Sequence, residues 1–283
     1  MTRGVGAALR RQRALTVAAL VCLVALAWAW LLLGAGMDMA PHAALDPFPH
    51  ATTSAMEMGA GMDMDMAPAG WGVAEFTLAV SMWWVMMIAM MLPSAAPAIL
   101  LYGRVRRHRG SDPAIGPSWL FVLGYLLAWL GFSLIAAGAQ WALVEAGHVD
   151  AMALRLTRPV WAGALLIAAG LYQLSPLKLA CLRQCRSPAQ FISRHWRPGA
   201  AGALRLGLLH GAYCVGCCWL LMALLFVGGA MNLALVAALA ALVAVEKVAR
   251  VGPVAARVIG VALILGGAAL VAFQPIAAVP PAP

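Results

Sequence analysis

Residues 204–229 read LRLGLLHGAYCVGCCWLLMALLFVGG, and their only charged side chain is Arg205, next to the start. An α-helix of this length extends about 39 Å at 1.5 Å per residue. The hydrocarbon core of a bilayer is roughly 30 Å thick. A stretch this long and this apolar predicts a membrane-spanning helix.

The rest of the chain has the same character. It is 64% hydrophobic and 10% charged, with a mean hydropathy of +0.90, and a water-soluble globular domain could not cover so much apolar surface. The expected spans are Ala14–Gly36, Gly72–Leu101, Ser118–Glu145, Pro159–Pro176, Leu204–Gly229, Asn232–Ala249 and Pro253–Phe273. We therefore expect an all-α, polytopic transmembrane helix bundle of about seven helices.

Basic residues predict the orientation of these spans, because short loops rich in Lys and Arg remain cytoplasmic. They cluster in residues 3–13, 104–109, 178–205 and 247–257, on every second loop. The N-terminus is therefore expected in the cytoplasm and the C-terminus outside, with only Arg155 and Arg158 in conflict. Topology and anionic headgroups explain the net charge of +9, so no nucleic-acid partner is expected.

Four segments follow from this arrangement. Residues 1–36 form a basic segment and a signal-anchor helix, 37–71 an outer loop, 72–273 a six-helix membrane domain, and 274–283 a Pro-rich tail. The first helix is expected to stay uncleaved, since its apolar run of roughly twenty residues exceeds the 7–15 of a signal peptide. The predicted location is the bacterial inner membrane, with multiple passes.

The outer loop has an unusual composition. It contains Met37, Met39, Met56, Met58, Met62, Met64, Met66, Asp38, Asp46, Glu57, Asp63, Asp65, His42 and His50. Solvated methionines cannot be explained as core filler. The loop either gathers copper loosely through thioethers and carboxylates or is a featureless linker.

The quoted stretch also carries the candidate metal ligands His210, Cys214, Cys217 and Cys218. At about 100° per residue, the first three lie within roughly 60° of one another, and Cys218 lies just beyond. Thiolate and imidazole suit Cu(I) or Zn, and thioether favours Cu(I). The alternative is that small cysteines only allow close helix packing.

Methionines of the second span, above all Met86 and Met90, are candidate thioether ligands. The second span runs inward and the fifth outward, so Met90 should lie about 16 Å from the cytoplasmic end of its span and Cys214 about 15 Å. The two sets of sulfur groups are thus expected at one level. Methionine as a filler of core gaps is the alternative.

Cys181 and Cys185 follow the fourth span, close to several basic side chains that favour thiolate. They could be metal ligands, a redox pair or interfacial residues. Glu246 and Lys247 are expected to be an interfacial anchor or an internal ion pair, and Gln173 a hydrogen-bond partner between helices.

Three motifs resemble one family. They are MMxxMMLP at 86–93, YQxxPLKxxCxxxCR at 172–186 and GxxCxGCCWxxM at 211–222. The chain is similar over residues 72–270 to an uncharacterised bacterial group of predicted metal-binding integral membrane proteins, domain of unknown function 2182. The positions that match its pattern are Met90, Met91, Cys181, Cys185, Cys214, Cys217 and Cys218.

These observations favour a membrane protein that handles a soft transition metal, with copper preferred to zinc, in uptake, transfer or insertion. Its expected partners are the bilayer, the ion, and a metallochaperone or membrane complex. One alternative is a thiol–disulfide or electron-carrying oxidoreductase that uses Cys214 with Cys217 and Cys181 with Cys185. Another is a non-catalytic assembly factor. No phosphate loop, dinucleotide fingerprint or serine nucleophile motif supports an enzyme of those kinds.

Overall fold

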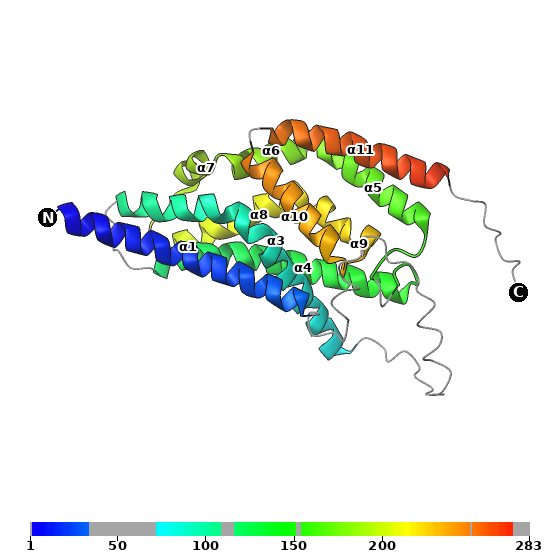
Figure 1. Cartoon of the computed structure of the whole chain (residues 1–283), viewed down its shortest axis with the longest axis horizontal. Helices are drawn as coiled ribbons and strands as arrows, with labels where there is room; N and C mark the ends of the chain where they lie inside the picture. The colour runs from blue at the N-terminus through cyan, green and yellow to red at the C-terminus, as the bar shows by residue number, and fades with distance from the viewer. Residues whose placement is uncertain (1, 34–71, 109–115, 151–153, 250, 274–283) are drawn as a thin grey trace, which may run out of the picture.

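The computed structural model describes residues 2–33, 72–108, 116–150, 154–249 and 251–273, which form long helices lying side by side (Figure 1). The helices are α1 (Thr2–Leu32), α3 (Val73–His108), α4 (Gly116–Glu145), α5 (Pro159–Leu174), α6 (Pro176–Arg186), α7 (Pro188–His195), α8 (Gly199–Ala223), α9 (Leu225–Gly228), α10 (Leu233–Val248) and α11 (Gly252–Ala272). Within these ranges the only β pairing is an isolated bridge between Val149 and Leu156. The expected all-α fold is confirmed.

Five helical stretches in the described ranges are long and apolar enough to cross a membrane. They are Arg13–Leu32, Val73–Arg106, Ser118–Glu145, Gly199–Gly228 and Gly252–Ala272. A sixth arises if α5 and α6, which are bent by 62° relative to each other, form one broken span. The expected span at Asn232 corresponds to α10, whose 16 residues extend only about 24 Å.

The bend between α5 and α6 is encoded locally. Ser175 ends α5 with an extended backbone and then caps α6, because its side chain accepts a hydrogen bond from the Lys178 backbone N–H. Pro176 occupies the first position of α6, where its missing N–H costs nothing. The chain therefore changes direction at Ser175 and leads α6 across α8.

Helices α4 and α8 touch through their backbones. A Cβ atom at Gly207 of α8 would lie 2.0 Å from the Phe121 carbonyl oxygen, and one at Gly124 of α4 would lie 2.2 Å from the Leu204 carbonyl oxygen. Small residues at such contacts let membrane helices approach closely and pack without a hydrophobic driving force. This contact fixes how α8, with its cysteines, faces α4.

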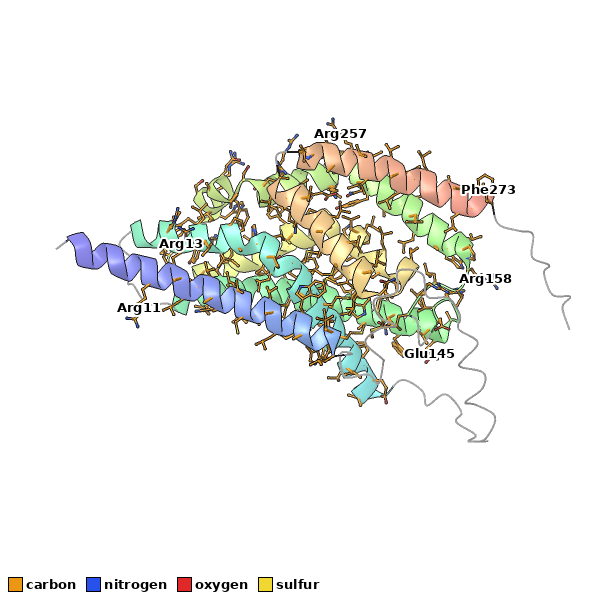
Figure 2. All side chains as sticks on the ribbon, viewed as in Figure 1. Arg11, Arg13, Glu145, Arg158, Arg257 and Phe273 are labelled. Carbon is orange, nitrogen blue, oxygen red and sulfur yellow. The ribbon has the colours of Figure 1, made fainter. Side chains whose placement is uncertain are left out.

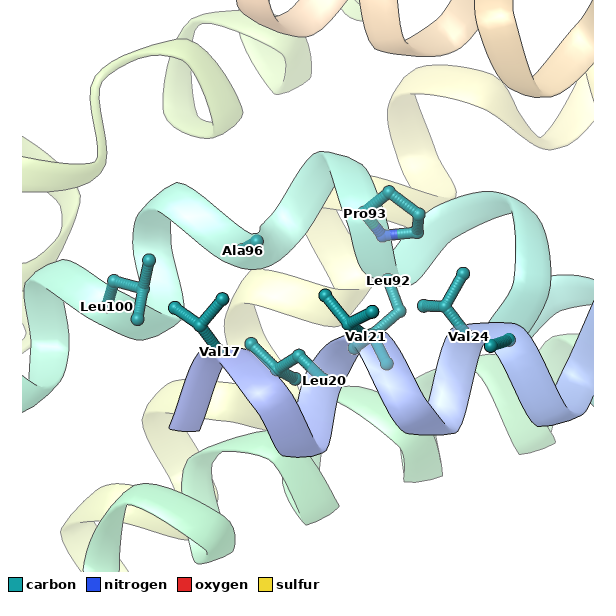
Figure 3. Close-up of a pocket in the computed structure, with 9 residues that line it drawn as sticks. Val17, Leu20, Val21, Val24, Leu92, Pro93, Ala96 and Leu100 are labelled. Carbon is teal, nitrogen blue, oxygen red and sulfur yellow. The ribbon is translucent and has the colours of Figure 1, made fainter. Parts of the chain in front are cut away.

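Helix α3 carries Pro93 and Pro97 in its interior, and Figure 1 shows its course changing along its length. Each proline removes a backbone donor and bends the helix. Beside this bend, α1 and α3 line an open apolar pocket of about 410 Å³ (Figure 3). Its lining includes Val21, Leu92 and Pro93.

The outer surface of the bundle is apolar along its flanks. On α11, Val254, Val258, Val261 and Leu265 are all exposed on one side of the helix. Such a contiguous apolar surface suits contact with lipid. Figure 2 shows Arg11 and Arg13 near one end of the bundle, with Glu145, Arg158 and Phe273 near the other.

Candidate functional site

The three cysteines of α8 lie on its buried side. Cys214, Cys217 and Cys218 are 2%, 1% and 1% exposed. The thiols of Cys217 and Cys218 donate to the Cys214 carbonyl oxygen at 3.1 and 3.0 Å. They therefore face the interior of the bundle and not the lipid.

Helices α10 and α4 contribute polar groups at Cys214. The Lys247 ammonium donates to Cys214 Sγ at 2.8 Å. The Tyr125 hydroxyl lies 3.1 Å from the same sulfur and donates to the Met91 carbonyl oxygen at 3.1 Å. Cys214 is thus the sulfur on which cationic and hydroxyl groups converge.

Helix α3 contributes a thioether at the same level. Met91, whose side chain is fully buried, has its Sδ 4.0 Å from Cys218 Sγ and 3.8 Å from Lys247 Nζ. The sulfurs of α3 and α8 therefore meet. The predicted thioethers Met86 and Met90 are also buried, but among the described hydrogen bonds it is Met91 that reaches a thiol.

Helix α6 adds a further sulfur. The Cys185 thiol interacts with the thiols of Cys214 and Cys217. Cys181, one turn earlier, lies against the α8 backbone, since a Cβ at Gly216 would be 3.0 Å from its Sγ. The structure thus brings Cys185 into the same group as the α8 cysteines and leaves Cys181 at its edge, and both of these α6 cysteines are partly exposed.

We call Cys185, Cys214, Cys217, Cys218 and Met91 the sulfur cluster. Its members come from α3, α6 and α8, and Lys247 enters it from α10. Of the two cysteines outside the cluster, Cys181 lies at its edge and Cys22 is exposed on α1, and all six cysteines are free thiols.

His210 lies one turn before Cys214 and is 3% exposed. Its ring centroid is 5.2 Å from that of Phe191 and 5.9 Å from those of Phe121 and Tyr125. Its Nδ1 is buried with no hydrogen-bond partner among the described residues. The structure places His210 one helical turn before the sulfur cluster on α8, among three aromatic rings.

The sulfur cluster is not arranged as a finished coordination site. No group of three or more His, Cys, Asp or Glu side chains in the described ranges is disposed to hold a metal ion. Two thiols are directed at a backbone carbonyl, and the Lys247 ammonium lies between Cys214 and Met91. A bound ion therefore requires thiol rotation. The donor types, thiolate and thioether, fit a soft monovalent ion.

A second polar group lies beside the cluster. Lys178 Nζ is 2.7 Å from Glu246 Oε2, and Gln173 donates to Glu246 Oε1 at 2.6 Å and accepts from Lys178. Gln173 is thus a hydrogen-bond partner between helices, as expected. The expected ion pair exists, but the partner of Glu246 is Lys178 of α6 and not its neighbour Lys247.

Three functional side chains had weak or no signals in the sequence. Tyr125 is an aromatic residue in an apolar span, and only the fold shows that its hydroxyl meets Cys214. Met91 adjoins the predicted Met90, and only the fold shows that its sulfur lies near Cys218. The sequence could have predicted that Lys247 and Glu246 contact different helices, because adjacent helical side chains point about 100° apart. The predicted Met/Asp/His loop lies outside the described residues.

Comparison with protein families finds one match. The family model PpoB2, described as a copper chaperone, matches residues 80–270, which include the whole sulfur cluster and Lys247. The expected family relationship over residues 72–270 is therefore supported, under this description and not under a domain-of-unknown-function name. Comparison with curated proteins and with solved structures gives no match.

Proposed function

The chain belongs to the PpoB2 copper chaperone family, and we propose that it binds Cu(I) as cargo within the membrane, through its sulfur cluster. One observation carries the proposal. Three helices bring four thiols and one thioether together, and of these side chains all but the partly exposed Cys185 are buried. Packing alone does not require sulfur at all of these positions.

The chemistry of the cluster favours copper over zinc. Thiolate and thioether are soft ligands that prefer Cu(I). A structural zinc site commonly uses four Cys or His ligands in a tetrahedron. Here the cluster also contains the thioether of Met91, a ligand type that such zinc sites do not use.

A route for the ion follows from the order of sulfur groups. The outer loop of residues 37–71 gathers copper at the mouth of the bundle, and the sulfur cluster binds it. Cys185 and Cys181, which are both partly exposed on α6, receive the ion from the cluster by ligand exchange. His210, whose Nδ1 has no partner in the described structure, supplies a nitrogen ligand next to Cys214.

The setting is a multi-pass protein of the bacterial inner membrane. Five apolar helices of sufficient length support this placement. The cargo is taken up, transferred to a metallochaperone or inserted into a membrane complex.

Cu(I) binding by the purified protein tests the proposal. Under anaerobic conditions, competition with a chromophoric Cu(I) chelator is expected to show one tightly bound ion, with sulfur as its main ligand in X-ray absorption. The combined substitution Cys214→Ser, Cys217→Ser and Cys218→Ser is expected to abolish tight binding. Cys22→Ser is the matched control, since Cys22 is exposed on α1, and it should bind as the wild type does. Equal binding by the triple variant would refute the proposal.

A thiol–disulfide oxidoreductase is the second candidate, because Cys185 interacts with Cys214 and Cys217 across two helices. Such a carrier must cycle between dithiol and disulfide. Thiol trapping after oxidation and reduction discriminates the two functions. Quantitative reversible loss of two thiols without any bound copper would favour the oxidoreductase.

A further inference from the structure

The chain contains two lysines, Lys178 and Lys247, and both are buried. Lys178 forms an ion pair with Glu246. Lys247 has no carboxylate within ion-pair distance among the described residues. Its contacts are Cys214 Sγ at 2.8 Å, Ser94 Oγ at 3.4 Å and Met91 Sδ at 3.8 Å.

The position of Lys247 is fixed by its helix. Glu246 is held against α6 by Lys178 and against α5 by Gln173, and Arg186 donates to the carbonyl oxygens of Glu246 and Ala249 at the end of α10. Because neighbouring helical side chains diverge by about 100°, Lys247 is directed away from α6 into the cluster. Only 7% of its surface is exposed.

A cation inside an apolar bundle is costly unless an opposite charge lies next to it. Among the groups in direct contact with Lys247 in the described structure, Cys214 is the one that can supply that charge as a thiolate. The ammonium is therefore paired with sulfur in this protein, where an ordinary buried lysine would be paired with a carboxylate.

We infer that Lys247 is the fixed counter-cation of the sulfur cluster and makes it select a monovalent over a divalent metal ion. This inference rests on the proposed function. A Cu(I) ion held by two thiolates carries a net charge of −1, which the ammonium reduces to zero. A divalent ion on the same two thiolates gives a total of +1 and is repelled twice as strongly by Lys247. In a region of low dielectric constant the neutral arrangement is favoured.

Metal affinities of charge variants test the inference. Cu(I) and Zn(II) are each titrated against competing chelators, using full-length protein in nanodiscs. Lys247→Met removes the charge and keeps the apolar stem, and Lys247→Arg keeps the charge. We expect Lys247→Met to lower the ratio of Cu(I) to Zn(II) affinity at least about tenfold, and Lys247→Arg to stay within about threefold of wild type. Ser94→Ala is the matched control, because it removes a contact of Nζ without changing charge, and its ratio should match wild type.

Other outcomes overturn the inference. If Lys247→Met binds Cu(I) and has the same ratio of Cu(I) to Zn(II) affinity as the wild type, the charge of Lys247 does not select the ion. Higher Cu(I) affinity in Lys247→Met would show that the ammonium competes with the cargo. If Lys247→Met does not fold, Lys247→Gln gives the same comparison. Absence of Cu(I) binding in the wild type would instead refute the proposed function.

Discussion

Lys178 Nζ of α6 lies 2.7 Å from Glu246 Oε2 of α10, and the two side chains are 0% and 2% exposed. This ion pair ties together two helices that each bring a functional group to the sulfur cluster. Cys185 follows Lys178 by two turns on α6, and Lys247 directly follows Glu246 on α10. The ion pair therefore fixes the positions of the Cys185 thiol and the Lys247 ammonium relative to each other.

Breaking the ion pair on one side should destabilise the protein. Glu246→Leu leaves the Lys178 ammonium buried without its partner, and we expect a loss of about 3 kcal/mol in the free energy of unfolding. Combining it with Lys178→Met removes both charges and should recover most of that loss. Thermal unfolding in detergent measures both effects. A double variant no more stable than the single one would contradict this reading of the pair.

Among the buried methionines, only Met91 is expected to matter for copper. Met91→Leu removes the thioether next to Cys218 and should weaken Cu(I) binding about tenfold, while the similar side-chain volume keeps the loss of stability below about 1.5 kcal/mol. Met86→Leu is the matched control, because Met86 is equally buried. Chelator competition compares the two, and equal affinities would exclude Met91 as a ligand.

Close contact of α4 with α8 predicts a sharp contrast between two glycines. Gly207→Ala would push a methyl group to 2.0 Å from the Phe121 carbonyl oxygen, so the helices must separate, at a cost of about 2 kcal/mol. Gly131→Ala meets nothing within 4 Å and should leave stability unchanged or raise it by about 0.5 kcal/mol. Thermal unfolding of the two variants checks this. Similar losses in both would mean that α4 and α8 pack differently.

The orientation of the bundle remains a prediction from the distribution of basic residues. Reporters inserted in residues 109–115 should be cytoplasmic, and reporters inserted in residues 146–153 or fused after residue 273 should be outside. Paired fusions to green fluorescent protein and alkaline phosphatase measure this, since the first is fluorescent only inside and the second active only outside. The reverse pattern would invert the proposed route of the ion.

The fold was largely predictable, because hydropathy and length determine which segments can cross a bilayer. The spans expected at Ser118–Glu145 and Pro253–Phe273 agree with α4 and α11 almost to the residue. The bend at Ser175 was not predicted. It depends on the Ser175 cap and on Pro176, which together end α5 and begin α6.

The candidate site was predictable in its residue types and less so in its partners. Periodicity placed the α8 cysteines on one side of their helix, and they are buried there. It selected Met86 and Met90 on α3, whereas the structure places the sulfur of the neighbouring Met91 near Cys218. Contacts between helices, such as that of Lys247 with Cys214, depend on tertiary packing, which a single sequence does not encode in any local pattern.

Both lysines are enclosed within the bundle, so the exposed cationic side chains that predict the orientation, such as Arg104, Arg183 and Arg194, are arginines. A guanidinium group keeps its proton at any pH that a cell meets. Neither an alkaline cytoplasm nor enzymatic acetylation of lysine can therefore erase the charges on which the predicted orientation rests. We accordingly expect the reporter fusions to give the same orientation in every physiological state of the cell.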